Sequence, residues 1–143
     1  MGSGECREGK QPARFNDLLP LPPAAASPQP PAPGPLIALS IRQPYVEMIL
    51  RGTKKIEYRS LPTRRRGRIY IYASRIPADD PEAWQAIAAT PGDFPVGLLV
   101  GTVEITGCSG RRGNYHWHLA HPERLADPLP VSKKPQPMFF YPW

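Results

Sequence analysis

Apolar and polar positions alternate along the chain in a way that predicts short strands and helices. Residues 36–40 (LIALS) form a brief apolar run, which is typical of a buried strand. Val46, Ile49 and Leu50 then fall on one face at helical spacing. Gly52 is suited to the left-handed position that ends a helix. These residues therefore predict a strand followed by a short amphipathic helix.

The rest of the chain contains further runs of strand and helix character. Residues 96–105 (VGLLVGTVEI) form the longest apolar run and are the best candidate for a central strand. A second helix is expected to begin at Asp80-Pro81 and to end near Ala89. The remaining strands are predicted at residues 55–59, 69–74, 115–119, 128–131 and 138–141. About four to six strands with two interleaved helices indicate an α+β domain around a curved sheet or small β-barrel.

Residues 1–35 differ in composition from the rest of the chain. They contain 9 of the 21 prolines, and their three basic and three acidic residues cancel. Proline removes a backbone donor and favours extended conformations in the residue before it. We therefore expect a disordered, proline-rich tail over residues 1–35 and one folded domain over residues 36–143. As an alternative, the tail would be the working part of a protein-interaction adaptor that docks in a proline-binding groove.

The net charge and the cysteine count narrow the possible classes of function. Residues 36–143 carry the whole formal charge of +6, which favours an anionic partner such as nucleic acid. Two cysteines exclude a disulfide-dense scaffold and a four-cysteine zinc site. The sequence lacks an apolar run of the ~20 residues that a membrane span needs, and its first apolar stretch lacks the core of a signal peptide. We therefore expect a soluble, cytoplasmic, monomeric protein.

Polar residues after the first predicted helix are candidates for a binding or catalytic site. Lys54 follows the helix-ending glycine on a turn, where its ammonium offers three donors to a phosphate or a base carbonyl. Glu57 and Arg59 project from one face of the next strand, together with Lys55. Such a cluster can line a cleft, with Glu57 orienting Lys54 or a base amino group. The alternative is a solvated lysine beside an exposed row of ion pairs, which adds little stability.

Glu104 stands out because it lies within the most apolar run of the chain. It shares one strand face with Thr102 and Thr106. A carboxylate there must find a partner or face a cleft. Lys54 would satisfy it, and a Lys–Glu pair in a partly dry pocket can act as a general base with a charge stabiliser. The alternative is a Glu that faces solvent on a half-exposed strand.

Basic residues are concentrated on three predicted loops. Arginine binds phosphate oxygens in bidentate geometry, and clustered arginines repel one another without an anionic partner. The loops would form a track for a nucleic-acid strand if they meet at one rim, and would otherwise be three solvated loops. Their basic residues are Arg64, Arg65, Arg66, Arg68, Arg111, Arg112, Lys133 and Lys134.

Aromatic and histidine side chains supply two further candidates. Tyr45, Tyr115 and Trp117 are placed to stack on bases, although Trp117 also fits a core position. Histidines at positions 116, 118 and 121 suggest a metal site by residue type, but no cysteine or pair of carboxylates completes the set. We therefore expect no metal and no cofactor.

Four features in fixed order, between residue 36 and about residue 132, carry a family resemblance. A strand leads into Gln43-Pro44-Tyr45, and a short apolar helix follows. Next comes G-x-K-x-x-E-x-R at residues 52–59. Downstream, a strand ends in Glu104, and Tyr115-His116-Trp117 precedes a Pro-Leu-Pro-Val run. In these motifs the chain resembles the ASCH family, a branch of the PUA-like superfamily.

The resemblance implies a PUA-like β-barrel with helices packed on it, a cleft beside the G-x-K motif, and binding of RNA or single-stranded nucleic acid. Some members resemble enzymes: one group deacetylates N4-acetylcytidine, and another cuts single-stranded RNA. The deacetylase residues would map to Lys54, Glu57 and Glu104. Glu57 stands where that group has a Thr, and an ionised carboxylate only accepts hydrogen bonds.

From these observations we expect single-stranded RNA, or a nucleotide or modified nucleoside, to bind in a cleft floored by Lys54, Glu57 and Glu104. The Lys54 ammonium and the Glu104 carboxylate would then converge on one small ligand. Tyr45, Arg59 and the three basic loops would supply further nucleic-acid contacts. A metal-independent RNA endonuclease and an N4-acetylcytidine-type amidohydrolase are the enzymatic alternatives.

Overall fold

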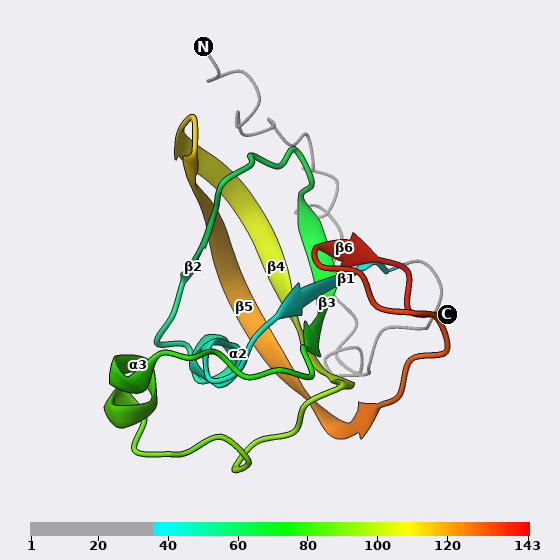
Figure 1. The fold of residues 1–143 in the computed structure, drawn as a ribbon. Coiled ribbons are helices and arrows are strands. Elements are labelled where there is room, and N and C mark those ends of the chain that lie inside the picture. The colour runs from blue at the N-terminus through cyan, green and yellow to red at the C-terminus, as the bar shows by residue number, and fades with distance from the viewer. Residues whose placement is uncertain (1–35) are drawn as a thin grey trace, which may run out of the picture.

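The computed structural model describes residues 36–143, so the tail expected over residues 1–35 lies outside the described residues. The elements are β1 (Ala38–Ile41), α2 (Tyr45–Leu50), β2 (Ile56–Arg59), β3 (Gly67–Ala73), α3 (Pro81–Ala86), β4 (Leu98–Arg111), β5 (Asn114–Leu129) and β6 (Phe139–Phe140) (Figure 1). This α+β content agrees with the sequence prediction. Neither helix has the length and apolar character needed to cross a bilayer.

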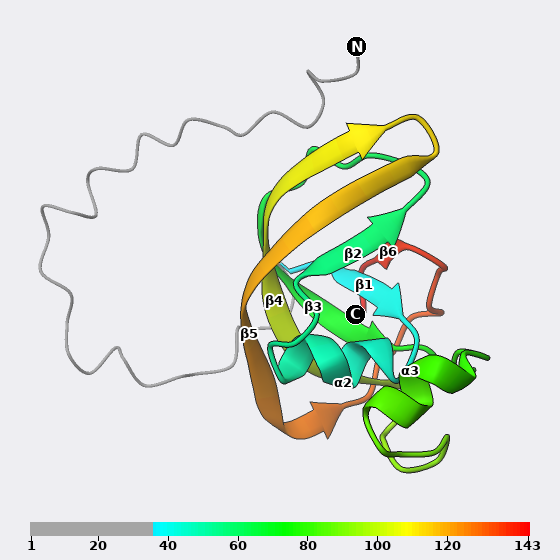
Figure 2. The same ribbon diagram turned by 90° about the vertical axis from the view of Figure 1, so that its left-hand side faces the viewer.

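All six strands belong to one mixed sheet in the order β2-β5-β4-β3-β1-β6. β1 and β3 are parallel, and every other neighbouring pair is antiparallel. β4 and β5 form a long hairpin that curves around the side on which α2 and β1 lie (Figure 2). β2 and β6 are the edge strands, and the sheet is not closed. The fold is therefore an open, curved sheet, and the closed PUA-like barrel that was expected is not confirmed.

The main core lies between α2 and the sheet. Ile49 of α2, Val103 of β4 and Trp117 of β5 are all buried there. Gly101 allows the helix to approach β4 closely, because a Cβ at this position would lie 2.6 Å from Cδ2 of Leu50. The helical face predicted from the sequence is thus the face that packs on the sheet.

A second apolar cluster covers the opposite side of the sheet. Tyr72, Leu99 and Phe140 are buried in it, and Val131 and Trp143 pack against them. The chain after β5 therefore returns along the sheet to reach β1. This return brings residues 134–137 to the end of β1, where they form one wall of a pocket.

The β4–β5 hairpin is longer than the apolar runs at residues 96–105 and 115–119 predicted. Its tight turn depends on Gly110 and Gly113, which have φ angles of +109° and +83°. A Cβ at Gly110 would lie 2.4 Å from the carbonyl oxygen of Asn114. The separate strand predicted at residues 128–131 is not formed: residues 128 and 129 are the end of β5, and residues 130 and 131 lie outside any strand.

Candidate functional site

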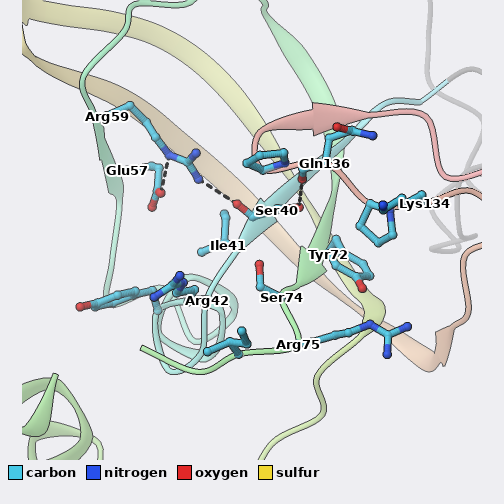
Figure 3. A pocket seen from close by; sticks show the side chains of 14 residues that line it. Ser40, Ile41, Arg42, Glu57, Arg59, Tyr72, Ser74, Arg75, Lys134 and Gln136 are labelled. Carbon is cyan, nitrogen blue, oxygen red and sulfur yellow. Dashed lines mark hydrogen bonds and ion pairs between the residues drawn. The ribbon is translucent and has the colours of Figure 1, made fainter. Parts of the chain in front are cut away.

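A pocket of about 750 Å³ lies at the carboxyl ends of β1 and β3 (Figure 3). β2 forms one side of it, and residues 134–137 form another. Its polar and charged lining residues are Ser40, Arg42, Tyr45, Glu57, Arg59, Tyr72, Ser74, Arg75, Lys134 and Gln136. The charged lining residues are four cations and one carboxylate, so the pocket favours an anionic ligand.

The single parallel strand pair explains how part of this lining is assembled. β1 and β3 run side by side with Ile41 opposite Ala73. Parallel strands end at the same edge of a sheet, so the residues that follow them are brought together. Arg42 and Arg75 both reach the pocket in this way. These two arginines were not predicted as site residues from the sequence. The signal that could have indicated them is their position just after predicted strands.

The turn after α2 sets the path into β2. Gln43 is buried before the helix, and its side-chain oxygen accepts the backbone N–H of Glu47 (3.1 Å). After the helix, Gly52 takes a φ angle of +85°, as expected for a left-handed end. The Met48 carbonyl then accepts the backbone N–H of Lys54 (3.1 Å). The backbone of the G-x-K motif is thereby tied to the helix.

Glu57 and Arg59 connect β2 to β1 across the open side of the sheet. Glu57 is 8% exposed, and its Oε2 lies 2.8 Å from Nε of Arg59. Arg59 also donates from Nη2 to the Ser40 carbonyl oxygen (2.9 Å), as Figure 3 shows. Its guanidinium carbon lies 5.6 Å from the ring centroid of Trp117. These side-chain contacts join β2 to β1, and they leave charged groups facing a pocket.

Lys54 contacts Glu57 but does not itself line this 750 Å³ pocket. Its Nζ is 3.7 Å from Oε1 of Glu57. It also lies over the rings of Tyr45 and Tyr58, at 5.4 and 5.2 Å from their centroids. Because the Lys54 side chain is only 18% exposed, its ammonium interacts mainly with these three neighbours and little with solvent. Lys54 therefore holds Glu57 and Tyr45 in place at the pocket.

Tyr45 joins the pocket to α3. Its hydroxyl donates a hydrogen bond to the Asp80 carboxylate, which also accepts the backbone N–H of Ala83 (3.2 Å) at the start of α3. Burial, followed by the hydrogen bond to Asp80, raises the pKa of Tyr45 to about 12. The same hydrogen bond lowers the pKa of Asp80. At neutral pH Tyr45 is therefore a protonated donor and Asp80 an ionised acceptor.

Glu104 has a different partner. Its neighbours Val103 and Ile105 point into the main core, so strand alternation directs Glu104 to the opposite face of β4. There its Oε1 lies 2.8 Å from Nδ1 of His121. Among the described residues, no ion pair joins Glu104 to Lys54, and Glu104 does not line the pocket. Lys54 and His121, the partner of Glu104, both line a separate pocket of about 360 Å³, and the convergence of Lys54 and Glu104 on one ligand stays a prediction.

The basic residues of the three predicted loops differ in their surroundings. Lys134 lines the pocket, whereas Lys133 is exposed outside it. Arg111 and Arg112 are exposed at the turn of the β4–β5 hairpin, which extends away from the helices (Figure 1).

Several arginines of the loop before β3 contact the protein itself. The Arg65 guanidinium lies 5.1 Å from the Phe139 ring centroid, and Arg66 donates to the Thr63 carbonyl oxygen (3.1 Å). Arg68 donates to Oγ1 of Thr102 (2.8 Å). Arg64 is exposed.

The aromatic and histidine candidates also occupy separate places. Trp117 is fully buried and belongs to the main core, and Tyr115 packs at its margin. His118 contacts Oγ of Ser109 through Nε2 (2.8 Å), and His116 packs edge-on against Tyr58. Within residues 36–143, no group of three or more metal-ligating side chains is found.

Comparisons with known proteins agree with the motif. An ASCH domain model matches residues 39–128. Activating signal cointegrator 1 of Homo sapiens and that of Mus musculus are each 32% identical to the chain over 85 residues. The match covers 52% of this chain and 14% of each relative, so it spans a small part of those proteins. ASCH domains are generally associated with RNA binding, and the chain belongs to the ASCH domain family.

Proposed function

We propose that the pocket binds one nucleotide of a single-stranded RNA. The observation that carries this proposal is the buried Glu57 carboxylate, which Arg59 and Lys54 hold at a pocket whose other charged lining residues are cations. A carboxylate has about four lone-pair positions, so Glu57 can accept a further hydrogen bond from a ligand. Nucleobases offer such donors in their amino and imino N–H groups.

The cations and the carboxylate of the pocket are suited to bind different parts of a nucleotide. Arg75 and Lys134 are both exposed and line the pocket away from Glu57 (Figure 3). They are suited to the phosphate, because their charges remain open to an incoming anion. Glu57, which is buried, is suited to the edge of the base. A volume of about 750 Å³ falls within the range of small-ligand pockets.

The geometry favours binding over either enzymatic alternative. Hydrolysis without a metal needs a base, an acid and a cationic stabiliser within reach of one reacting atom. The Lys54 ammonium is engaged with Glu57, Tyr45 is a protonated donor to Asp80, and Glu104 pairs with His121. Each group considered for catalysis is therefore engaged with a partner inside the protein.

The proposal is tested by the affinity of the protein for a fluorescein-labelled single-stranded octaribonucleotide, measured by anisotropy against the same RNA as a duplex. The single strand is expected to bind more tightly, because a paired base cannot enter the pocket. Lys134→Ala should weaken this binding about fivefold, which corresponds to ~1 kcal/mol. It should also reduce the slope of log affinity against log salt by ~0.7, the value for one phosphate contact on a single strand.

Lys133→Ala is the matched control, because it removes the same charge from the adjacent exposed position outside the pocket. Equal effects of the two substitutions would show that general charge, and not the pocket, binds RNA. The two enzymatic alternatives are tested by incubating the protein, in the presence of EDTA, with the same RNA and separately with N4-acetylcytidine. A product from either substrate would refute a binding-only role.

A further inference from the structure

Tyr58 is an aromatic residue left open on the side of β2 that faces away from the pocket. It is 58% exposed, although it lies between Glu57 and Arg59 in the strand. Its cross-strand neighbour on β5 is His116, and the two rings meet edge-on with centroids 4.9 Å apart. One face of the Tyr58 ring has the Lys54 ammonium nearby. An exposed ring held in place by a cation and a second ring is a ready platform for stacking.

Lys54 connects this platform to the pocket. Its Nζ lies 3.7 Å from Oε1 of Glu57 and 5.2 Å from the Tyr58 centroid, so one ammonium contacts groups on both faces of β2. β2 is an edge strand of the sheet. No further strand among residues 36–143 therefore blocks a path around it from the pocket to Tyr58.

Positive charge is also present beyond Tyr58, at the turn of the β4–β5 hairpin. His116 pairs with Ser109 across β4 and β5, and the register then runs to Arg111 at the turn. Arg111 and Arg112 are exposed there. A chain of phosphates that passes Tyr58 would thus move toward further positive charge.

We propose that the ligand is a strand of at least two nucleotides, in which one base occupies the pocket and the adjacent base stacks on Tyr58 after the backbone rounds β2. This inference rests on the proposed function of the pocket. It assigns Tyr58 as a second base-binding position that contributes affinity for a strand and none for a single nucleotide.

The test compares a mononucleotide with a short strand. Binding of cytidine 5′-monophosphate and of a fluorescein-labelled tetraribonucleotide is measured for the wild type, Tyr58→Ala, Tyr58→Phe and Tyr141→Ala. Tyr58→Ala should weaken tetranucleotide binding about 5- to 100-fold, the range expected for one stacked base. Mononucleotide affinity should change less than about twofold, and Tyr58→Phe should retain strand binding because the ring remains. Tyr141 is the control, since it is also an exposed tyrosine but does not line the pocket or contact Tyr58.

A double-mutant cycle identifies the stacked base. Each base of the tetranucleotide is replaced in turn by an abasic ribose, and one replacement should cost affinity with the wild type but nothing further with Tyr58→Ala. The inference is overturned if Tyr58→Ala affects strand binding no more than Tyr141→Ala does. It is also overturned if Tyr58→Ala weakens mononucleotide and strand equally, because Tyr58 would then act through the pocket. Failure of the wild type to bind either probe would overturn the proposed function together with this inference.

Discussion

Two tyrosine hydroxyls beside the pocket differ in their hydrogen bonding. Tyr45 donates to Asp80, whereas the buried hydroxyl of Tyr72 has no hydrogen-bond partner within residues 36–143. A buried polar group without a partner costs roughly 1–3 kcal/mol, and a typical hydrogen bond contributes about 1 kcal/mol. The two residues therefore offer a matched pair of Tyr-to-Phe substitutions at one site.

Tyr72→Phe should leave the free energy of unfolding unchanged or raise it by up to ~1 kcal/mol, because it removes only the unsatisfied hydroxyl. Tyr45→Phe should lower it by about 1 kcal/mol, because Asp80 loses its donor. Thermal melting should place Tyr72→Phe at the wild-type midpoint or up to a few degrees above it, and Tyr45→Phe a few degrees below it. A loss of stability in Tyr72→Phe as large as that in Tyr45→Phe would mean that the Tyr72 hydroxyl is satisfied.

Individual residues also show what the sequence can reveal about the site. Glu57, Arg59 and Tyr45 were predicted from the motif, and all three line the pocket. Glu104 was grouped with them because strand alternation says which residues share a face but not which face meets the cleft. Arg75 was not predicted as a site residue because its place beside β1 depends on the parallel pairing of β1 and β3.

At the scale of elements, α2 is attached to β5 by an ion pair as well as by apolar packing. Glu47 is 6% exposed on the buried side of the helix. Arg124 of β5 donates to both of its carboxylate oxygens at 2.9 Å, and Arg51 donates to Oε2 at 2.8 Å. The hydrogen bonds from Arg124 are the main cause that lowers the pKa of Glu47 below its usual value of 4.5. Folding therefore favours the ionised form of this carboxyl group.

This pairing predicts a specific dependence of stability on pH. Because the folded-state pKa is depressed, the contribution is complete above the unfolded value of about 4.5 and is lost as the pH falls through the folded value. Glu47→Gln should lower the free energy of unfolding by ~1–2 kcal/mol at pH 7, a discounted figure because both arginines are about half exposed. Urea unfolding at pH 7, 5, 4 and 3 should show the difference from the wild type shrinking below pH 5. A difference that stays constant down to pH 3 would contradict this assignment.

The elements differ in how well their sequence patterns define them. The helical face and the short strands were predictable because their apolar residues enter the main core. The far half of the β4–β5 hairpin was not, because residues 106–111 pair with residues 114–118 while half of their side chains face solvent. Register shifts at three places, beginning between Leu99 and Gly101, further break the alternation on which a strand prediction depends.

At the scale of the whole molecule, the open sheet accounts for the position of the pocket. The edge strands β2 and β6 do not pair, so the sheet leaves an opening between β2 and β1. Here Arg59 spans this opening from Glu57 to the Ser40 carbonyl. The sequence predicted the curved α+β domain, but closure depends on the relation between strands distant in the chain, which residue patterns do not specify. The central claim is that a nucleotide binds at this opening.

The most direct test of that claim is to map the binding site by two-dimensional 1H–15N NMR during titration with a single-stranded tetraribonucleotide. We expect the largest shifts in the amides of Ser40, Glu57, Ser74 and Arg75, which surround the pocket. Tyr58 should shift with the strand but not with cytidine 5′-monophosphate. Shifts confined to the hairpin turn at residues 111–113 or to α3, with the pocket amides unmoved, would contradict the account.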